Sequence, residues 1–187
     1  MPFQYIIFNK PYRVLCQFTP SGDKITLKDF GFPPHVYPIG RLDYDSEGLL
    51  LLSDDKKLVD LLLNPNHEHE RVYLVQVENI PSSTSLRLLS KGLEMGDYVS
   101  KTCEVQKLDK FHEPFPRNPP IRVRKNIPDT WLEIKLREGK NRQVRKSVAK
   151  IGHPCLRLIR IQTGKINLNE ISLSPGQWQK IDRAQIL

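Results

Sequence analysis

The chain has 187 residues, which is enough to bury a hydrophobic core within one domain of ordinary size. Hydrophobic residues make up 39% of it and charged residues 27%, a balance that excludes disorder along most of the chain. Lys and Arg number 29 against 21 Asp and Glu, so the formal net charge of +8 favours polyanionic partners, and nucleic acid is the first of these to consider.

The sequence gives little support for a targeting signal, a disulfide or a metal site. No apolar run approaches the roughly 18 residues of a membrane span, and the N-terminus lacks a basic segment followed by a cleavable apolar one, so we expect a cytoplasmic protein. Cys16, Cys103 and Cys155 are scattered and odd in number, which argues against a disulfide framework or a CxxC site. His67 and His69 have no partner at a recognised zinc spacing, and we expect no metal site.

The first half of the chain predicts alternating strands and helices, beginning close to the N-terminus. Residues 4–9 are apolar and rich in β-forming side chains, which predicts a strand. Asp54 or Asp55 can cap a helix over residues 56–64, whose leucines fall on one face before Pro65 ends it.

A second strand and a second helix follow. Residues 71–79 alternate in polarity and predict a strand whose odd-numbered apolar side chains share one side. A Ser/Thr cluster begins a helix over residues 83–91, and Gly92 ends it. This order of elements predicts a mixed α and β core.

Residues 111–128 are rich in proline and in basic side chains. Proline lacks an amide donor and fixes its own backbone, so this stretch is predicted to be an extended surface loop rather than a central strand. Two interpretations stay open, namely a loop that touches phosphate groups and a solvated connector. The basic side chains of the stretch are Arg117, Arg122, Arg124 and Lys125.

The last predicted strand and helix lie among many basic residues. Residues 130–139 predict an amphipathic strand that ends in a turn, with every second side chain facing inward. Residues 141–152 predict a short helix whose apolar stripe includes Val144. Arg145 follows Val144 directly, so its side chain can run along the edge of the core into a cleft.

An acidic stretch over residues 38–55 stands out in this basic chain. One interpretation is two-metal phosphodiester chemistry, in which carboxylates converge on magnesium ions. Another is a polar turn whose side chains satisfy backbone amides before the next strand begins near Gly48. The acidic residues are Asp43, Asp45, Glu47, Asp54 and Asp55.

The sequence motif within the same stretch supports a third interpretation. GRLDYDSEGLLLLSDD (residues 40–55) resembles the catalytic motif of the pseudouridine synthases of the RsuA family. Three further segments resemble motifs of that family in the same order, namely NKPYRVLCQF (9–18), RVYLVQV (71–77) and REGKNRQVRKSVAKIGHPCLRLIRIQTG (137–164). The likeness is greatest to members without an N-terminal S4 module. We therefore expect one catalytic domain over residues 1–187, with the proline-rich loop inside it and no S4 domain.

The resemblance implies a fold and an activity. The fold would be of the α+β class, a bent, mostly antiparallel mixed sheet with flanking helices and a central catalytic cleft. The activity would be isomerisation of a specific uridine to pseudouridine in large-subunit ribosomal RNA, by a monomer that needs no cofactor. A stacked uridine must be extruded before its glycosidic bond can be broken, so a basic surface has to hold the RNA backbone.

The resemblance also implies catalytic roles for three residues. Asp43 matches the aspartate that either attacks the anomeric carbon of the ribose or abstracts a ribose proton, and the sequence leaves both steps open. Tyr73 matches the tyrosine that stacks on the base and takes part in proton transfer at carbon 5. Arg145 matches the basic residue that pairs with the aspartate, where a guanidinium favours the ionised carboxylate and orients it.

Other positions are expected to hold the RNA. Arg41 matches the residue that fills the gap left by the flipped nucleotide, and Leu158 is expected to lie under the base. The usual His-Gln-Val triplet of the family appears here as Arg142-Gln143-Val144, an exchange that adds a fixed charge and bears on target specificity. The remaining RNA-binding candidates are Lys10, Lys140, Arg142, Gln143 and Lys146.

Two alternatives to an isomerase stay open. One is a non-catalytic ribosomal RNA-binding or assembly factor, in which no substitution of a carboxylate would matter. The other is a metal-dependent nuclease, which would need divalent metal ions at the acidic stretch.

Overall fold

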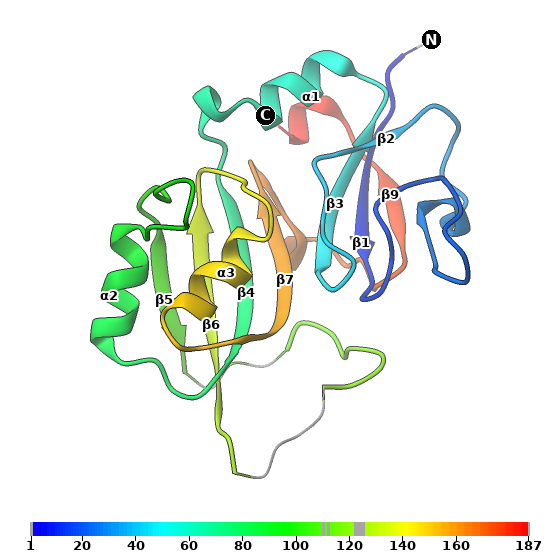
Figure 1. Cartoon of the computed structure of the whole chain (residues 1–187). Coiled ribbons are helices and arrows are strands. Elements are labelled where there is room, and N and C mark those ends of the chain that lie inside the picture. The colour runs from blue at the N-terminus through cyan, green and yellow to red at the C-terminus, as the bar shows by residue number, and fades with distance from the viewer. Residues whose placement is uncertain (1, 110, 112, 122–125, 187) are drawn as a thin grey trace.

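A nine-stranded mixed sheet runs through the molecule in this computed structural model (Figure 1), which describes residues 2–109, 111, 113–121 and 126–186. The strand order is β5-β6-β4-β7-β3-β1-β9, with β2 beside β3 and β8 beside β7. The strands are β1 (Tyr5–Lys10), β2 (Tyr37–Ile39), β3 (Glu47–Ser53), β4 (Arg71–Glu78), β5 (Glu104–Leu108), β6 (Asp129–Leu136), β7 (Cys155–Thr163), β8 (Ile166–Asn167) and β9 (Trp178–Lys180). The helices are α1 (Lys56–Leu63), α2 (Ser83–Lys91) and α3 (Gln143–Lys150), with short 3-10 helices at Leu27–Phe30, Pro65–His67, Leu168–Glu170 and Arg183–Gln185.

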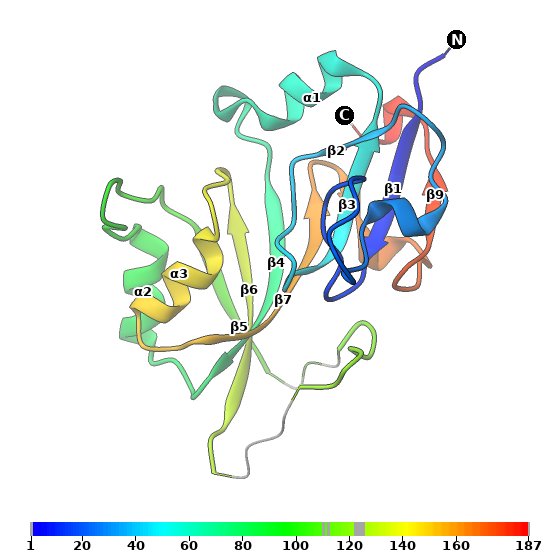
Figure 2. The same cartoon turned by 45° about the vertical axis from the view of Figure 1, so that its right-hand side comes forward.

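The sheet consists of two antiparallel halves that meet at a short parallel junction. One half holds β5, β6, β4 and β7, and the other holds β3, β1 and β9. At the junction Glu47 pairs with Ile159 and Gly48 pairs with Arg160. Figure 2 shows α2 and α3 over one face of the first half, while α1 lies near β2 and β3 of the second. The predicted α+β fold, a mostly antiparallel mixed sheet with flanking helices, is confirmed.

Local capping signals account for α1 and α2. Asp55 caps α1 by accepting hydrogen bonds from the amides of Lys57 and Leu58, at 3.0 and 3.3 Å. Ser82 caps α2 in the same way, and α2 ends at Gly92, whose φ is 90°. Both helices lie where the sequence predicted them. Within the described ranges, no helix has both the length and the apolar character needed to cross a membrane.

Helix α3 was predicted from residue 141 but begins at Gln143. Arg142, which precedes it, has a left-handed backbone with a φ of 51° and makes no side-chain capping hydrogen bond. The chain therefore turns sharply into the helix. Val144 and Val148 face the sheet, as predicted from the apolar stripe.

Each half of the sheet has its own packed apolar core. One cluster lies between the sheet and α2 and α3, and it includes Tyr73 and Leu158. A second packs α1 against β1 and β3, and a third gathers aromatic rings around Phe8. A fourth covers the other face of β4 and β7. The second cluster also takes in Ile166 of β8, which pairs with β7, so this packing and the junction together set how the two halves are placed.

The proline-rich loop contains no helix or strand among its described residues, as predicted. It is nevertheless tied to the protein, because Glu113 forms a 2.7 Å ion pair with Arg157 of β7 and Phe115 packs against two of the core clusters. The Cζ atom of Arg117 lies 4.2 Å from the ring centroid of Tyr12. These contacts exclude a purely solvated connector. Arg122, Arg124 and Lys125, the other basic residues of this loop, lie outside the described residues.

Replacing Gly48 by alanine is expected to disrupt the junction. Gly48 has a φ of +98°, and an added Cβ would lie 2.3 Å from the carbonyl oxygen of Arg160 and 2.9 Å from Cγ2 of Ile159. This overlap, together with the unfavourable backbone conformation, should lower the free energy of unfolding by about 3 kcal/mol or more, as measured by chemical denaturation.

Gly96→Ala is the matched control for that experiment. Gly96 has a φ of +97°, but nothing lies within 4 Å of an added Cβ. The control should lower the free energy of unfolding by only about 1–2 kcal/mol, which is the backbone contribution alone. Equal destabilisation by the two substitutions would contradict the close packing of β3 against β7.

Candidate active site

A cleft of about 540 Å³ lies between the two halves of the sheet. It is lined by residues 39–44 and Ser46, by the loop before α3 and by side chains of β4 and β7. Residues that are distant in the sequence thus meet around one space. The predicted site residues that line it are Arg41, Asp43, Tyr73, Lys140, Arg142, Gln143 and Leu158.

Asp43 begins a tight turn that leads into β3, the aspartate turn (residues 43–46). The amide of Ser46 donates to the carbonyl of Asp43 at 3.0 Å, and the amide of Arg13 donates to the carbonyl of Tyr44 at 2.9 Å. β3 begins directly afterwards, at the junction. The backbone of the turn is therefore held by hydrogen bonds, while the Asp43 side chain stays 33% exposed.

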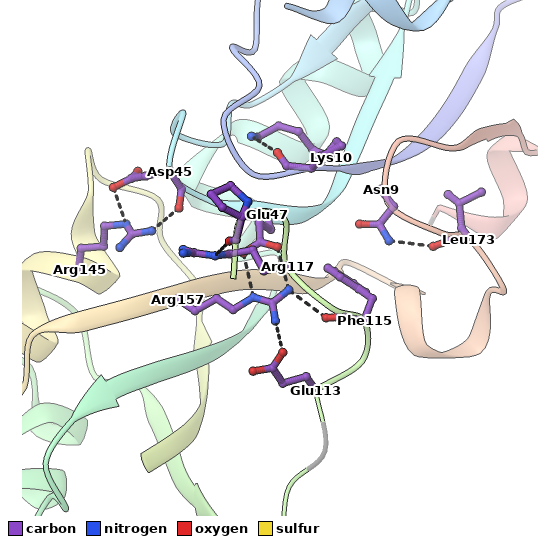
Figure 3. A network of polar contacts seen from close by, with 12 residues as sticks. Asn9, Lys10, Asp45, Glu47, Glu113, Phe115, Arg117, Arg145, Arg157 and Leu173 are labelled. Atoms are coloured by element: carbon purple, nitrogen blue, oxygen red, sulfur yellow. Dashed lines mark hydrogen bonds and ion pairs between the residues drawn. The ribbon is translucent and has the colours of Figure 1, made fainter. Parts of the chain in front are cut away.

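Two arginines at the start of α3 bind the aspartate turn, chiefly through Asp45. Arg142 donates from Nη1 and Nη2 to the two carboxylate oxygens of Asp45, each at 2.9 Å. Its Nη1 also lies 3.5 Å from Oδ2 of Asp43. Arg145 places Nε 3.3 Å from Oδ2 of Asp45 and donates from Nη2 to the backbone carbonyl of the same residue (Figure 3).

The prediction that Arg145 pairs with Asp43 is wrong in this structure. Arg145 binds Asp45, and the ion pair of Asp43 is with Arg142, the residue that stands in place of the usual histidine. The left-handed backbone of Arg142 brings its guanidinium within reach of both carboxylates. Sequence spacing could not separate two aspartates that belong to one turn.

The charges around Asp45 determine its ionisation. Partial burial raises the pKa of this carboxyl, but the hydrogen bonds and charges of Arg142 and Arg145 outweigh burial, so the pKa lies below its ordinary value. Asp45 therefore keeps its charge, and with it the arginine contacts, until the pH falls below the ordinary range of an aspartate. Burial raises the pKa of the Cys155 thiol to about 11, so a neutral thiol faces Nη1 of Arg145 at 3.4 Å.

Tyr73 and Leu158 form an apolar floor beside Asp43. Tyr73 lies at a register irregularity between β4 and β7, where it pairs with Arg160, and Leu158 pairs with Val75 on the same face. Tyr73 is 9% exposed and Leu158 is 5% exposed, both within the core cluster beneath α3. An apolar surface with an aromatic ring next to a carboxylate suits a base that has left its stack.

The cleft also contains two arginines that the sequence analysis missed, Arg71 and Arg160. Arg71 donates from Nη2 to the carbonyl of Leu62 at 3.0 Å, and burial lowers its pKa. Arg160 is 4% exposed and donates from Nε to the carbonyl of Leu49 at 2.8 Å. Basic side chains within apolar strands were the available signal, because a buried charge needs a partner or a function.

Lys10 does not line the cleft, although it was predicted to bind RNA. It is 0% exposed in β1, where its Nζ donates to the carbonyls of Pro11 and Val14, each at 2.9 Å. Burial lowers its pKa to about 8. The predicted RNA contact is therefore wrong, and Lys10 instead braces the loop that follows β1.

Gln143 lines the cleft, but its amide is engaged within the protein. Its Oε1 accepts from the amide of Lys140 at 3.1 Å, and its Nε2 donates to Glu138. Gln143 is only 4% exposed, so it shapes the loop that carries Lys140 and Arg142. Lys146 lies outside the cleft, exposed on α3.

The acidic stretch does not gather into one cluster. Asp55 caps α1, Glu47 pairs with the buried Arg157, and Asp45 pairs with Arg142. In the part of the chain that the structure describes, no group of three or more His, Cys, Asp or Glu side chains is placed to hold a metal ion.

Comparison with known proteins agrees with the motifs and the fold. The sequence profile of the family described as RNA pseudouridylate synthase matches residues 4–150. Ribosomal large subunit pseudouridine synthase E of Xanthomonas campestris pv. campestris is 46% identical over 179 residues, covering 95% of each chain. The protein of the same name from Vibrio parahaemolyticus is 46% identical over 176 residues, covering 94% of this chain and 73% of the relative.

A solved structure is similar along almost the whole chain. The crystal structure of a pseudouridylate synthase matches with a TM-score of 0.80 and 25% sequence identity, covering 99% of this chain and 73% of that one. The resemblance predicted from the motifs is thereby confirmed. Because the profile matches most of the chain and the relatives are similar along nearly all of it, the chain belongs to the RNA pseudouridylate synthase family.

Proposed function

We propose that the chain isomerises a specific uridine of large-subunit ribosomal RNA to pseudouridine, with Asp43 as the catalytic carboxylate. The observation that carries this proposal is the position of Asp43 in a basic cleft, beside the apolar floor of Tyr73 and Leu158. The relatives named synthase E support the choice of the large subunit, because they are 46% identical to this chain over most of its length. Family membership favours the isomerase over a non-catalytic RNA-binding factor or a nuclease.

The reaction exchanges one bond to the ribose for another. The bond between N1 of uracil and C1′ breaks, the base turns, and a bond from C5 to C1′ forms, while C5 loses a proton and N1 gains one. Nothing is oxidised or hydrolysed overall. The steps need a carboxylate, a surface that holds the released base and a site closed to water, so we expect no cofactor. We also expect the protein to act as a monomer. A ribosomal substrate implies that the protein works in the cytoplasm.

The residues around the cleft divide these tasks. Asp43 attacks C1′ or abstracts a ribose proton, and both steps require its carboxylate beside the sugar. Tyr73 stacks on uracil and takes part in moving the C5 proton, with Leu158 beneath the ring. Arg145 acts through Asp45, because it holds the turn on which Asp43 stands.

Basic side chains of the cleft bind the RNA. Arg41 lies next to Asp43 and fills the gap that the flipped nucleotide leaves. Lys140 and Arg142 belong to the loop before α3, and Arg71 comes from β4. Contacts of this kind with phosphate groups hold the RNA in register and make binding depend on salt.

Asp43→Asn is expected to abolish pseudouridine formation and to leave the fold and most of the RNA affinity intact, because an amide is neither a nucleophile nor a base. The assay is release of tritium from C5 of labelled uridine in ribosomal RNA from a strain that lacks the gene, with RNA affinity measured by filter binding. Asp23→Asn, at an exposed position, is the control and should release tritium at the wild-type rate. Undiminished release by Asp43→Asn would contradict the role of Asp43.

Asp45→Asn is expected to loosen the hold of Arg142 and Arg145 on the aspartate turn. Loss of charge-assisted hydrogen bonds worth about 1.5–3 kcal/mol predicts a single-turnover rate at saturating RNA that is lower by roughly 10- to 100-fold. RNA affinity should be retained, because the substitution removes no cation from the cleft. A wild-type rate in this variant would show that the arginine contacts do not place Asp43.

A further inference from the structure

A guanidinium group is buried where the two halves of the sheet meet. Arg157 of β7 is 1% exposed, and its neighbour Leu158 lines the cleft from the opposite face of the strand. The Nε and Nη2 atoms of Arg157 donate to both carboxylate oxygens of Glu47, at 2.9 and 2.8 Å. Nη1 donates to Oε2 of Glu113 at 2.7 Å, and Nη2 also donates to the carbonyl of Phe115 at 3.1 Å (Figure 3). One side chain thus joins β3, β7 and the proline-rich loop.

Glu47 connects Arg157 to the aspartate turn. It directly follows the turn as the first residue of β3, and it is 2% exposed. Its backbone pairs with Ile159 in the parallel junction, so both its backbone and its side chain are held by β7. The turn is therefore fixed at two points, with Asp45 held by Arg145 and Glu47 held from β7 (Figure 3).

On its other side, Arg157 binds Glu113, which lies at the protein surface. Glu113 is 42% exposed, and the guanidinium of Arg117 stacks over Tyr12. The residue after Tyr12 donates its amide to the aspartate turn. Residues 113–117 are therefore linked to the aspartate turn in two ways. Glu113 binds Arg157, and Arg117 contacts Tyr12.

A contribution to the stability of the fold does not by itself explain why this ion pair is buried here. Desolvation offsets much of the attraction between buried charges, and well-packed apolar pairs of similar volume are often at least as stable. A bidentate guanidinium does, however, fix the direction of a carboxylate more strictly than apolar packing does. A role in placing the turn therefore accounts better for Arg157 at this position.

We propose that Arg157 is a positioning residue for the isomerisation. Through Glu47 it sets the place of Asp43 in the cleft, and through Glu113 it holds residues 113–117 beside Tyr12 and near the aspartate turn, where Arg117 contacts bound RNA. This inference rests on the proposed function. It predicts separable effects, because the contact with Glu47 acts on the rate once RNA is bound and the contact with Glu113 acts on RNA binding.

Arg157→Lys tests the first effect. Lysine keeps the positive charge but cannot bond both oxygens of Glu47 with a planar fork and reach Glu113 as well. In protein shown to be folded by circular dichroism, the single-turnover rate at saturating RNA should fall by roughly 10- to 100-fold.

Glu113→Ala tests the second effect at a partly exposed position, where the fold should be kept. It should raise KM for RNA severalfold and leave the rate at saturation unchanged. Glu104→Ala is the matched control, because it removes a glutamate that is paired with Lys135 on β5 and β6, far along the sheet from the junction. The control should change neither quantity, and a wild-type KM in Glu113→Ala would overturn the role of that contact.

A double variant, Arg157→Met with Glu47→Leu, isolates positioning from stability. It replaces the ion pair by apolar side chains of similar volume, so the protein should remain folded. Its rate at saturating RNA should still fall by roughly 10- to 100-fold. A folded double variant with the wild-type rate would overturn the proposal, also in the case that Arg157→Lys does not fold.

Hydrogen exchange separates this proposal from the proposed function, because it needs no turnover. The amides of residues 44–46 should exchange faster in Arg157→Lys than in the wild type, while those of β5 should not change. Unchanged exchange in residues 44–46 would overturn the positioning role. Absence of pseudouridine with the wild-type protein would instead overturn the proposed function and leave the exchange result standing.

Discussion

The parallel contact between β3 and β7 is the constraint on which the site depends. Only the first residues of β3 take part, and Gly48 lies so close to the carbonyl of Arg160 that no side chain fits between them. β3 and β7 then run on without pairing to each other, and the cleft lies between the two halves they belong to. The short junction therefore leaves the space for a substrate, and together with the core cluster that includes Ile166 it fixes the walls of that space.

The two aspartates of the aspartate turn have different surroundings. Asp45 is bound by Arg142 and Arg145, so it serves as an anchor for the turn. Asp43 has one longer contact, 3.5 Å to Arg142, and keeps a third of its side chain exposed. A carboxylate would repel the phosphate groups of RNA, and the arginines and Lys140 that line the cleft offset that repulsion. The carboxylate that we propose to react is thereby distinct from the carboxylate that holds the turn.

Sequence signals predicted those parts of the structure that depend on short stretches of chain. The caps at Asp55 and Ser82 act over a few residues, so α1 and α2 lie where they were expected. Contacts between distant segments were not predictable in the same way. Arg145 meets Asp45, a residue 100 positions away, and the sequence could not choose between neighbouring carboxylates. Lys10 is buried because β1 lies between β3 and β9, which is a property of the topology and not of the local sequence.

A crystal structure of the Asp43→Asn variant with its substrate RNA would show whether the junction places Asp43 against the ribose of a flipped uridine. We expect a uridine extruded into the cleft, with uracil against Tyr73, Leu158 beneath it and C1′ facing the substituted side chain. The contacts of Arg142 and Arg145 with Asp45 should be unchanged. A target uridine that is bound elsewhere, or one whose ribose lies beyond reach of position 43, would contradict this placement of Asp43.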